Sequence, residues 1–567
     1  MPRLTGPMDR AAQDPAFADA TRRFEIGDFG AARAGYLQLA DRPELLAPAL
    51  CQLGRIAAAQ GDVMRAIGLL QQALAVAPAL LLGYRVLAEL QVGAGRMTAA
   101  QSTLLTLGNT LKAQGREEEA LSVYAEILAQ DPLHYGAAVN LGTVLAGRAR
   151  TGDALRYLLW GLCLGARRMA GLDDLVAQAM AEFPDVVVGP AGQLPAGAPT
   201  GVFGYIEGAL TTLGGLCKAQ GHYALALTFY RRAVDIAPGY ALGHWNLALA
   251  LLGAGAYDEG WREYEWRWHW PDFPETRRHL GVPVWQGESL VGCRILVWSE
   301  QGLGDTLQFV PLIDRLCAQG AEVALEVPDP LVRLLAANLP MVRVIPRADR
   351  PHTVKCELRF DYAIPLLSLP QRLDLTADTL PLARGYLKPL PEDTATWTAR
   401  LPQEDRLRVG LVWAGRPQHT KDAQRSLPFA MLQSLAAETA VDWYALQLGA
   451  RRSELERLPG RQISDLAPYL DDFGQTAAAL ARLDLVVTVD TSVAHLAGAM
   501  GVPAWVLLPE PCDWRWGQNG TSCAWYPFVR LFRQTRPGHW ETVIAQVKMQ
   551  LATLGMEDQV ARCADSS

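Results

Sequence analysis

A short glycine-rich segment, Gly302-Leu-Gly-Asp305, contains the first residue that could do chemistry. It follows the apolar run 294–299 and begins a pattern that could open a helix. Asp305 could cap that helix, or it could accept a proton from a substrate hydroxyl. The two roles are compatible, because a carboxylate at a helix N-terminus is held ionised by that helix. Gly302 and Gly304 would let the backbone approach a sugar without an intervening Cβ.

A second candidate site lies in the segment 490–495. A buried strand is expected to end at Asp490, and a helix to begin with Thr491 and Ser492. Free N–H groups and two hydroxyls at a helix N-terminus form an anion site. His495 lies four residues after Thr491, on the same helix face, where it could reach a phosphate or a sugar hydroxyl. The alternative is an ordinary turn, with Asp490 as the cap and His495 packed against the sheet.

Cations follow another expected strand, 408–413. Beyond Trp413 at its end come Arg416, Lys421 and Arg425. Guanidinium and ammonium groups neutralise the charge that grows on a leaving phosphate, so this loop could bind a diphosphate. A solvated surface loop is the alternative.

Other residues extend the candidate site. Gln447 ends a further expected strand and could contact a nucleotide, while Trp514 and Trp516 could close over a base or fill the core. No Asp-x-Asp sequence occurs. The carboxylate pair that commonly holds a divalent metal on a nucleotide-sugar diphosphate is therefore missing, and neither a metal nor another cofactor is expected.

The elements that would position these residues are strands alternating with helices. Short apolar runs, each followed by a turn and a helical pattern, occur at 294–299, 322–327, 408–413, 442–447, 485–490 and 504–509. This alternation predicts parallel sheets flanked by helices, with ligands beyond the carboxyl ends of the strands. The Pro-rich segment 387–393 divides this half into two doubly wound domains.

The first half of the chain is helical and repetitive. Small residues at turn positions recur at a 34-residue step in three phases: Gly27, Gly61 and Gly95; Gly115 and Ala149; Gly221 and Gly255. Pro78, Pro132 and Pro238 each follow one of these turns by 17 residues. Glycines that follow a leucine precede four of the turns by seven residues: Gly54, Gly108, Gly142 and Gly214.

This pattern resembles the tetratricopeptide repeat, in which small residues let paired helices pack closely. We expect about seven repeats over 13–274, interrupted near 185–205. The resemblance implies a concave groove that binds an extended peptide or another protein, with a homodimer contact as the alternative use. The tryptophans between Trp261 and Trp270 are expected to pack the array against the segment that follows.

Composition excludes several classes of protein. A chain of 567 residues should form two to four domains. A net charge of −7 argues against nucleic-acid binding, and the nine cysteines show neither a disulfide framework nor zinc-ligand spacing. The N-terminal segment lacks the apolar core of a signal peptide, and no apolar run reaches the roughly 18 residues of a membrane span. A cytoplasmic protein is expected.

Together, the segments GLGDTLQFVP (302–311) and DTSVAHLAGAMGVP (490–503) resemble the family-9 glycosyltransferases, the group of the lipopolysaccharide heptosyltransferases. The resemblance covers about 290–550. It implies a GT-B fold of two Rossmann-like domains and inverting transfer without a metal. Asp305 matches the proposed catalytic base. Lys421 or Arg425 matches the basic residue that binds the donor diphosphate, and Asp490, Thr491, Ser492 and His495 match the donor-binding turn.

The expected domains are the repeat array (13–274), an acceptor-side Rossmann-like domain carrying the base (283–387), a donor-side Rossmann-like domain (388–556) and a tail (557–567). A repeat array fused to a GT-B enzyme is similar to the protein O-glycosyltransferases, in which the repeats hold a polypeptide acceptor. We therefore expect sugar transfer from a nucleotide sugar to a Ser or Thr of a recruited protein, such as bacterial flagellin or another surface protein.

Two alternative functions stay open. The acceptor could be a lipopolysaccharide or polysaccharide, as for the heptosyltransferases. The second half could instead be an inactive GT-B fold in an adaptor that works through its repeats. The joint presence of Asp305, Lys421, Arg425 and His495 speaks against the adaptor.

Overall fold

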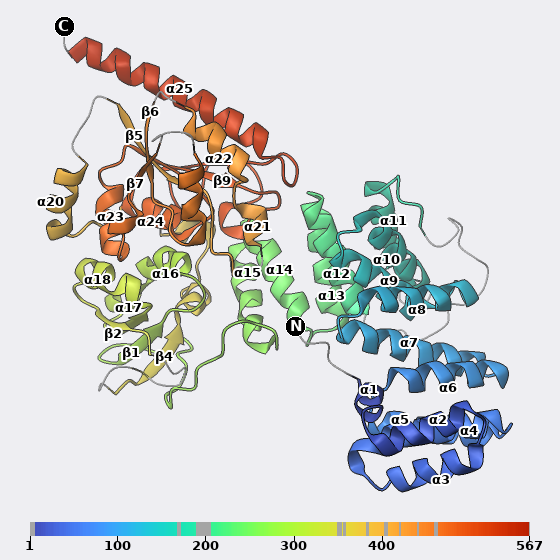
Figure 1. Cartoon of the computed structure of the whole chain (residues 1–567). Coiled ribbons are helices and arrows are strands. Elements are labelled where there is room, and N and C mark those ends of the chain that lie inside the picture. Colours follow the sequence, from blue (N-terminus) through green and yellow to red (C-terminus); the bar gives the residue numbers. More distant parts are fainter. Residues whose placement is uncertain are drawn as a thin grey trace. The chain divides into compact units, whose positions relative to one another are not determined.

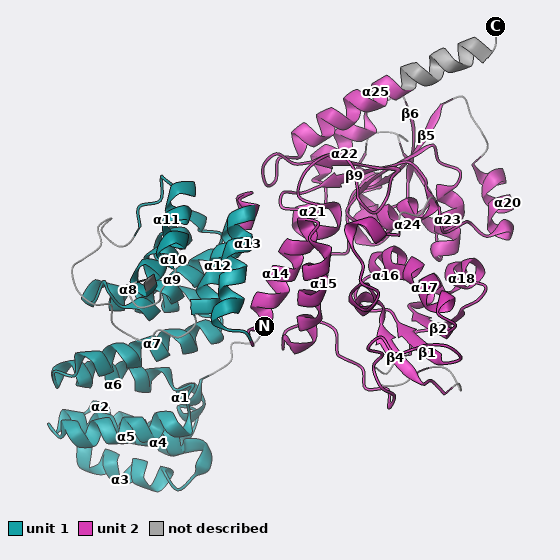
Figure 2. Cartoon of the chain, turned by 180° about the vertical axis from the view of Figure 1, so that it is seen from behind, with its two compact units in different colours: residues 1–217, 224–238 teal, residues 218–223, 239–567 magenta. Residues whose placement is uncertain are grey.

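The structure is a computed structural model. It describes residues 6–166, 172–188, 206–348, 354, 359–381, 385–401, 406–418, 421–438, 441–458 and 463–565. The chain forms two compact units, residues 1–217 with 224–238 and residues 218–223 with 239–567 (Figure 2). Helices make up the first half of the chain, and two sheets lie in the second (Figure 1).

The first half consists of antiparallel helix pairs. Its helices are α1 (Pro7–Ala11), α2 (Pro15–Glu25), α3 (Phe29–Leu39), α4 (Pro43–Ala59), α5 (Val63–Val76), α6 (Leu81–Gly93), α7 (Met97–Ala113), α8 (Glu117–Gln130), α9 (Tyr135–Gly147), α10 (Thr151–Ala166), α11 (Asp173–Glu182), α12 (Ile206–Ala219), α13 (Tyr223–Ile236), α14 (Ala241–Gly253) and α15 (Tyr257–Tyr264). The 3-10 helix η1 (Glu265–His269) follows α15.

The predicted turn residues have the backbone conformation that the repeat requires. All of them have positive φ: 81° at Gly27, 82° at Gly61, 71° at Gly95, 72° at Gly115, 57° at Ala149, 81° at Gly221 and 80° at Gly255. Glycine adopts this left-handed conformation at least cost, which explains its recurrence at a fixed step. The 34-residue periodicity is confirmed.

The glycines before the turns are explained by close helix packing. A Cβ on Gly108 would lie 2.4 Å from Tyr124 Cε1, and one on Gly214 would lie 2.5 Å from Tyr230 Cε1. Each tyrosine belongs to the other helix of its pair, so a larger residue would force the two helices apart. The sequence correctly predicted these close approaches.

The shift of phase after Gly95 also has a structural cause. Helix α7 begins after the Gly95 turn and ends before the Gly115 turn, so one helix is shared by two successive turns. Of the predicted interruption near 185–205, only residues 185–188 lie within the described residues.

The second half contains two wholly parallel sheets. Their strands are β1 (Arg294–Trp298), β2 (Glu322–Val327), β3 (Arg343–Pro346), β4 (Tyr362–Pro365), β5 (Leu407–Val412), β6 (Val441–Ala445), β7 (Ile463–Asp465), β8 (Leu485–Val489), β9 (Ala504–Leu508) and β10 (Val529–Arg533). The strand orders are β3-β2-β1-β4 and β10-β9-β8-β5-β6-β7. Every pair of neighbouring strands is parallel.

Helices connect these strands. They are α16 (Leu303–Phe309), α17 (Ile313–Ala318), α18 (Asp329–Asn338), α19 (Leu369–Arg372), α20 (Pro391–Arg400), α21 (Asp422–Arg425), α22 (Phe429–Ala436), α23 (Phe473–Leu480), α24 (Ser492–Met500) and α25 (Trp540–Asp565), with the 3-10 helix η7 (Trp514–Trp516). The expected class is confirmed: a helical repeat region precedes two Rossmann-like domains in a GT-B-like arrangement. We call β1–β4 with their helices the first sheet domain, and β5–β10 with theirs the second.

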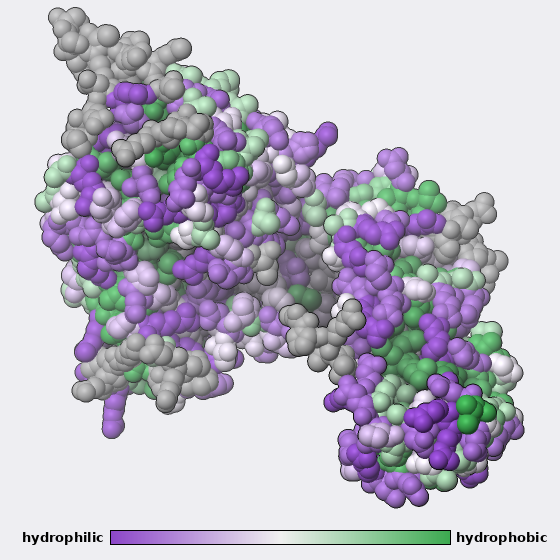
Figure 3. Space-filling model, viewed as in Figure 1, coloured by the Kyte–Doolittle hydropathy of each residue, from purple (hydrophilic) through white to green (hydrophobic). Residues whose placement is uncertain are grey.

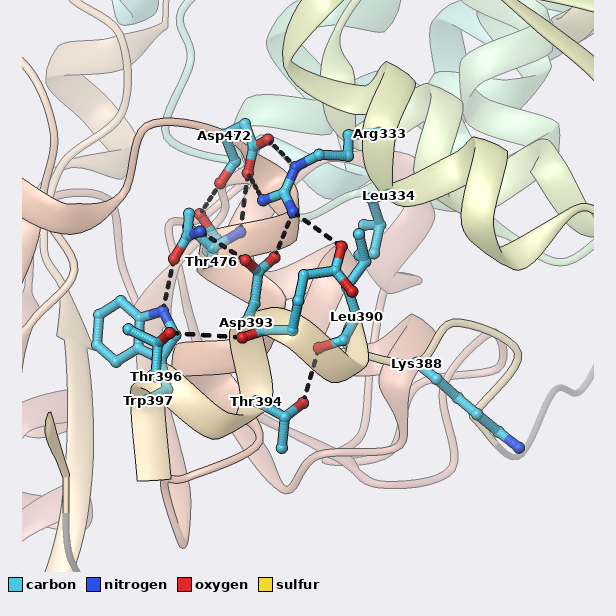
Figure 4. Close-up of polar contacts among 12 residues, drawn as sticks. Arg333, Leu334, Lys388, Leu390, Asp393, Thr394, Thr396, Trp397, Asp472 and Thr476 are labelled. Atoms are coloured by element: carbon cyan, nitrogen blue, oxygen red, sulfur yellow. Dashed lines mark hydrogen bonds and ion pairs between the residues drawn. The ribbon is translucent and has the colours of Figure 1, made fainter. Parts of the chain in front are cut away.

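Side-chain contacts also join the sheet domains and the segment between them away from the strand ends. Arg333 of α18 donates hydrogen bonds of 2.7 and 2.9 Å to the carboxylate of Asp472, and it lies 2.7 Å from Asp393 Oδ2 of α20 (Figure 4). In the connecting segment, the Tyr386 hydroxyl donates a hydrogen bond to Leu307 O at 2.6 Å.

The last helix pair packs against the sheet domains. Trp261 is buried and meets Phe309 and Trp514 edge to face, with ring centroids 5.7 and 5.4 Å apart. Trp514 and Trp516 are themselves buried and fill the core. The predicted packing role is confirmed for Trp261.

Hydrophilic residues cover much of the visible face, with hydrophobic residues in smaller patches (Figure 3). Within the described part of the chain, we find no helix with the length and apolar character to cross a bilayer.

Candidate functional site

Asp305 lies in the turn after β1, and two hydrogen bonds hold its side chain. Asp305 is the third residue of α16, and its Oδ2 accepts a hydrogen bond from Gly302 N–H at 2.7 Å. Its Oδ1 accepts a hydrogen bond from Arg515 of η7, in the second sheet domain. Only 15% of the Asp305 side chain and 11% of the Arg515 side chain are exposed. Asp305 therefore caps its helix and forms a largely buried ion pair between the sheet domains.

Arg515, the partner of Asp305, is a residue of the candidate site that was not predicted from the sequence. Its Nη1 donates a hydrogen bond to Asp513 Oδ1 at 2.8 Å, and its guanidinium carbon lies 4.4 Å from the centre of the Trp514 ring. Burial alone would lower the pKa of Arg515, but the carboxylates of Asp305 and Asp513 raise it above its usual value. In the segment 512–517 the sequence suggested roles for Trp514 and Trp516 only. No local pattern indicates a role for the arginine between them.

Gly304 makes the closest contact between the two turns. A Cβ at this position would lie 2.6 Å from Cδ2 of the His495 ring. His495 is 5% exposed, and its Nδ1 lies 3.0 Å from the Tyr526 hydroxyl. Burial, with a smaller effect of Arg515, lowers the pKa of His495 to about 3, so the ring is neutral at pH 7. The structure gives His495 the packing role, and a direct donor contact stays a prediction.

The turn after β8 leads into the N-terminus of α24. Thr491 precedes the helix in an extended conformation, and its hydroxyl lies 3.0 Å from the Thr488 hydroxyl. Ser492 is the first helical residue. Burial and the nearby carboxylate of Asp513 raise the pKa of Asp490 to about 6, against smaller opposing effects of Arg425 and Arg515. Cations from two elements thus act on the residue that precedes Thr491.

The cationic loop after β5 is built around Arg425. Arg425 Nε donates a hydrogen bond to Asp422 Oδ1 at 3.2 Å, and a Cβ on Gly415 would lie 2.4 Å from Arg425 Nη2. Lys421 and Arg416 are exposed. The charge of Arg425 lowers the pKa of Asp490, and which of Lys421 and Arg425 would bind a diphosphate stays a prediction.

Trp413 and Gln447 support this loop from within. Gln447 Oε1 accepts hydrogen bonds from the N–H groups of Trp413 (3.1 Å) and Ala414 (2.9 Å). Its Nε2 donates to Ala414 O at 3.1 Å and to Leu448 O at 2.8 Å. The Gln447 amide is thereby satisfied. The Trp413 ring is fully buried, and its indole N–H donates to Glu454 at 2.8 Å. Both residues hold the carboxyl ends of β5 and β6 together.

A buried ion pair supports the loop that carries Gly302. Arg267 of η1 is fully buried and donates a hydrogen bond to Glu300 Oε1 at 2.8 Å. It also donates to the Ser368 hydroxyl at 2.8 Å. Glu300 lies two residues before Gly302, so the segment that follows the last helix pair helps to position the Asp305 turn. This pair could not be predicted from local sequence, because Arg267 lies 33 residues from Glu300.

The segment 218–223 contributes to the same neighbourhood. The Tyr223 hydroxyl donates a hydrogen bond to Glu510 at 2.5 Å. Burial lowers the pKa of Lys218, and the charge of Lys421 lowers it further. The site therefore includes residues from the helical half of the chain that belong to the second compact unit.

Comparisons with known proteins agree with this two-part organisation. Residues 208–240 match the tetratricopeptide repeat family. Over 335 residues the chain is 29% identical to Protein FlbA of Caulobacter vibrioides, a match that covers 55% of each protein. The chain thus spans about half the length of this curated relative.

Two solved structures are similar in part. One is a family-9 glycosyl transferase from Veillonella parvula, 13% identical, with 48% of this chain and 99% of that chain covered and a TM-score of 0.36. The other is a K341M mutant of the Thermobaculum terrenum O-GlcNAc transferase, 15% identical, with 91% and 93% covered and a TM-score of 0.27. The chain thus has partial similarity to a family-9 glycosyl transferase and to an O-GlcNAc transferase.

Proposed function

We propose that this protein is an inverting, metal-independent glycosyltransferase that transfers a sugar from a nucleotide sugar to an acceptor hydroxyl. The observation that carries the proposal is the meeting of two strand-to-helix turns at Gly304 and His495. One turn presents the Asp305 carboxylate, and the other presents the N-terminus of α24 beside cations.

The charges of these groups suit the two ends of the reaction. The N–H groups of α24 and the hydroxyls of Thr491 and Ser492 would bind the donor diphosphate. Arg425, with Lys421, would neutralise the charge that develops on the leaving nucleotide. Since these groups supply the positive charge, the proposed mechanism needs no divalent metal.

Asp305 would act as the general base. The acceptor oxygen attacks the anomeric carbon from the side opposite the diphosphate, its proton passes to Asp305, and the bond to the nucleotide breaks with inversion. Asp305 is suited to this role because it lies at the N-terminus of α16, where a hydrogen bond from Gly302 N–H fixes its carboxylate.

A protein is the acceptor that we propose. Stacked helix pairs form surfaces that bind extended peptides, and the repeats occupy a large part of the chain. The repeat unit would recruit bacterial flagellin or another surface protein in the cytoplasm and present a Ser or Thr hydroxyl. A homodimer contact is a second use that the same surface could serve.

Intact-mass analysis tests the activity and the acceptor together. The full chain is incubated with a panel of nucleotide sugars and with either candidate proteins or a lipopolysaccharide acceptor. We expect one protein to gain the mass of one sugar, and Asp305→Asn to slow this transfer by about 10²–10⁴. Transfer to lipopolysaccharide alone would overturn the protein acceptor. Thermal stabilisation by nucleotides without any transfer would favour the adaptor.

A further inference from the structure

Both oxygens of the proposed base already have a hydrogen-bond partner in this structure. Gly302 N–H donates to Oδ2 of Asp305, and Arg515 donates to Oδ1. The contact with Gly302 is part of the helix cap and leaves room for a second hydrogen bond. The contact with Arg515 covers a side chain that is only 15% exposed, so the guanidinium competes with an acceptor hydroxyl for access to the carboxylate. Departure of Arg515 from Oδ1 would open the carboxylate to the acceptor.

Arg515 could form hydrogen bonds with groups other than Asp305. It is held by Asp513 through its Nη1, and its Nε has no hydrogen-bond partner among the described residues. Its charge also acts on Asp490, the residue before Thr491 at the proposed diphosphate site. A guanidinium forms paired hydrogen bonds with phosphate oxygens as readily as with a carboxylate. A diphosphate at the N-terminus of α24 would therefore compete with Asp305 for Arg515.

Cohesion between the sheet domains does not require this ion pair. Arg333 already joins α18 to Asp472 and to Asp393 of α20 (Figure 4). That arginine is 38% exposed, so its guanidinium gives up less hydration than that of Arg515, although its partner Asp393 is only 7% exposed. The Arg515 pair is largely buried, where two charges must give up their hydration. A costly pair on the proposed base itself points to a role beyond packing.

We propose that Arg515 is a positioning residue that couples donor binding to the base: it covers Asp305 when the donor site is empty, and it moves onto the donor diphosphate when that site is filled. This inference rests on the proposed function. Its consequence is an order of events, because Asp305 can accept a proton only after the nucleotide sugar has bound.

The movement of Arg515 from Asp305 to the diphosphate can be tested by measuring the affinity for nucleoside diphosphates, which requires no sugar transfer. ADP, GDP, UDP and CDP are compared by thermal shift with the wild-type chain, and the most stabilising one is titrated by calorimetry. Arg515→Gln should weaken binding about tenfold or more, because a charge-assisted contact is lost. Asp305→Asn should tighten binding at least about threefold, because the competing carboxylate is gone. In the Arg515→Gln background, Asp305→Asn should have no effect.

Arg333→Gln is the matched control, since it removes another arginine that joins the sheet domains through carboxylates. It should leave the affinity within about twofold of wild type. Arg515→Lys keeps the charge and guards against misfolding of the glutamine variant; it should bind with intermediate affinity. If wild type binds a nucleotide but Asp305→Asn fails to tighten binding, Arg515 is a structural cross-link and the inference fails alone. If no nucleoside diphosphate binds wild type, the proposed donor site fails with it.

Discussion

The turn after β1 and the turn after β8 follow the same plan but hold their acidic residues differently. Each leads from a central strand of a parallel sheet into the N-terminus of a helix. Asp305 lies inside its helix and pairs with Gly302 N–H and Arg515. Asp490 lies just before its helix, and burial with the neighbouring Asp513 raises its pKa to about 6.

Burial is the largest cause of the raised pKa of Asp490, and η7 with the residue before it adds to the difference although it lies in neither turn. Arg515 pairs with Asp305, while Asp513 acts on Asp490. One segment thus supplies the ion-pair partner of the first carboxylate and a neighbouring negative charge for the second. Two strand-to-helix turns can therefore place their carboxyl groups in different electrostatic environments, because those environments depend on side chains from outside the turns.

The largest predicted effect is a difference in the rate of sugar transfer between variants of the two carboxylates. Asp305→Asn should lower transfer by about 10²–10⁴, because the general base is lost. Asp490→Asn should lower it by only about threefold to tenfold, the effect of one hydrogen bond to the donor. Single-turnover assays at saturating donor measure both. A greater loss from Asp490→Asn would place the base in the turn after β8 and reverse the comparison.

The second prediction compares the two glycines of the first turn. A Cβ on Gly304 would lie 2.6 Å from the buried His495 ring, so Gly304→Ala should destabilise the fold by about 1–3 kcal/mol through overpacking. A Cβ on Gly302 would meet the Asp305 carboxylate at 3.0 Å, and this side chain can shift. Gly302→Ala should therefore cost less than about 1 kcal/mol.

Urea unfolding of both glycine variants gives the comparison. Equal losses of stability would mean that the two turns do not pack as closely as Gly304 and His495 indicate. A loss confined to Gly302→Ala would show instead that the helix cap made by Asp305 is the more sensitive feature.

The parts of the fold that could be predicted are those with a local sequence pattern, namely the repeat turns and the central strands. The repeat turns were found because positive φ favours glycine at a fixed step. The six predicted strands correspond to β1, β2, β5, β6, β8 and β9. The four that were missed, β3, β4, β7 and β10, are the outermost strands of the two sheets. Edge strands are paired on one side only, so their sequences need no long apolar run; β10 has two arginines among its five residues.

The candidate site was predictable only where its chemistry is local. The cap formed by Asp305 and the helix start at Ser492 follow from neighbouring residues. The partner of Asp305 does not, because Arg515 lies 210 residues away. Likewise, the spacing placed His495 on the face of Thr491, but only the packing of α16 against α24 shows that its ring is buried beneath Gly304. Long-range contacts decide which candidate residues stay accessible.

The smallest predicted effect is a pair of opposite pH dependences within the turn after β8. The pKa of His495 falls from 6.5 to about 3 on folding, so the unfolded chain binds the extra proton and stability is lost as the pH falls through this window. The pKa of Asp490 rises from 3.8 to about 6, so the folded chain keeps its proton longer and stability is lost as the pH rises through that window.

Each substitution should remove its own slope from the curve of unfolding free energy against pH. His495→Gln should flatten the acid side by at most about 1.4 kcal/mol per pH unit, the value for one proton, and Asp490→Asn should change the slope in the opposite sense. Urea unfolding between pH 4 and 7 measures both, with His539→Gln at an exposed histidine as the control. If His495→Gln keeps the wild-type slope, the imidazole is already open to water. It could then contact a donor phosphate directly, as the spacing to Thr491 first suggested.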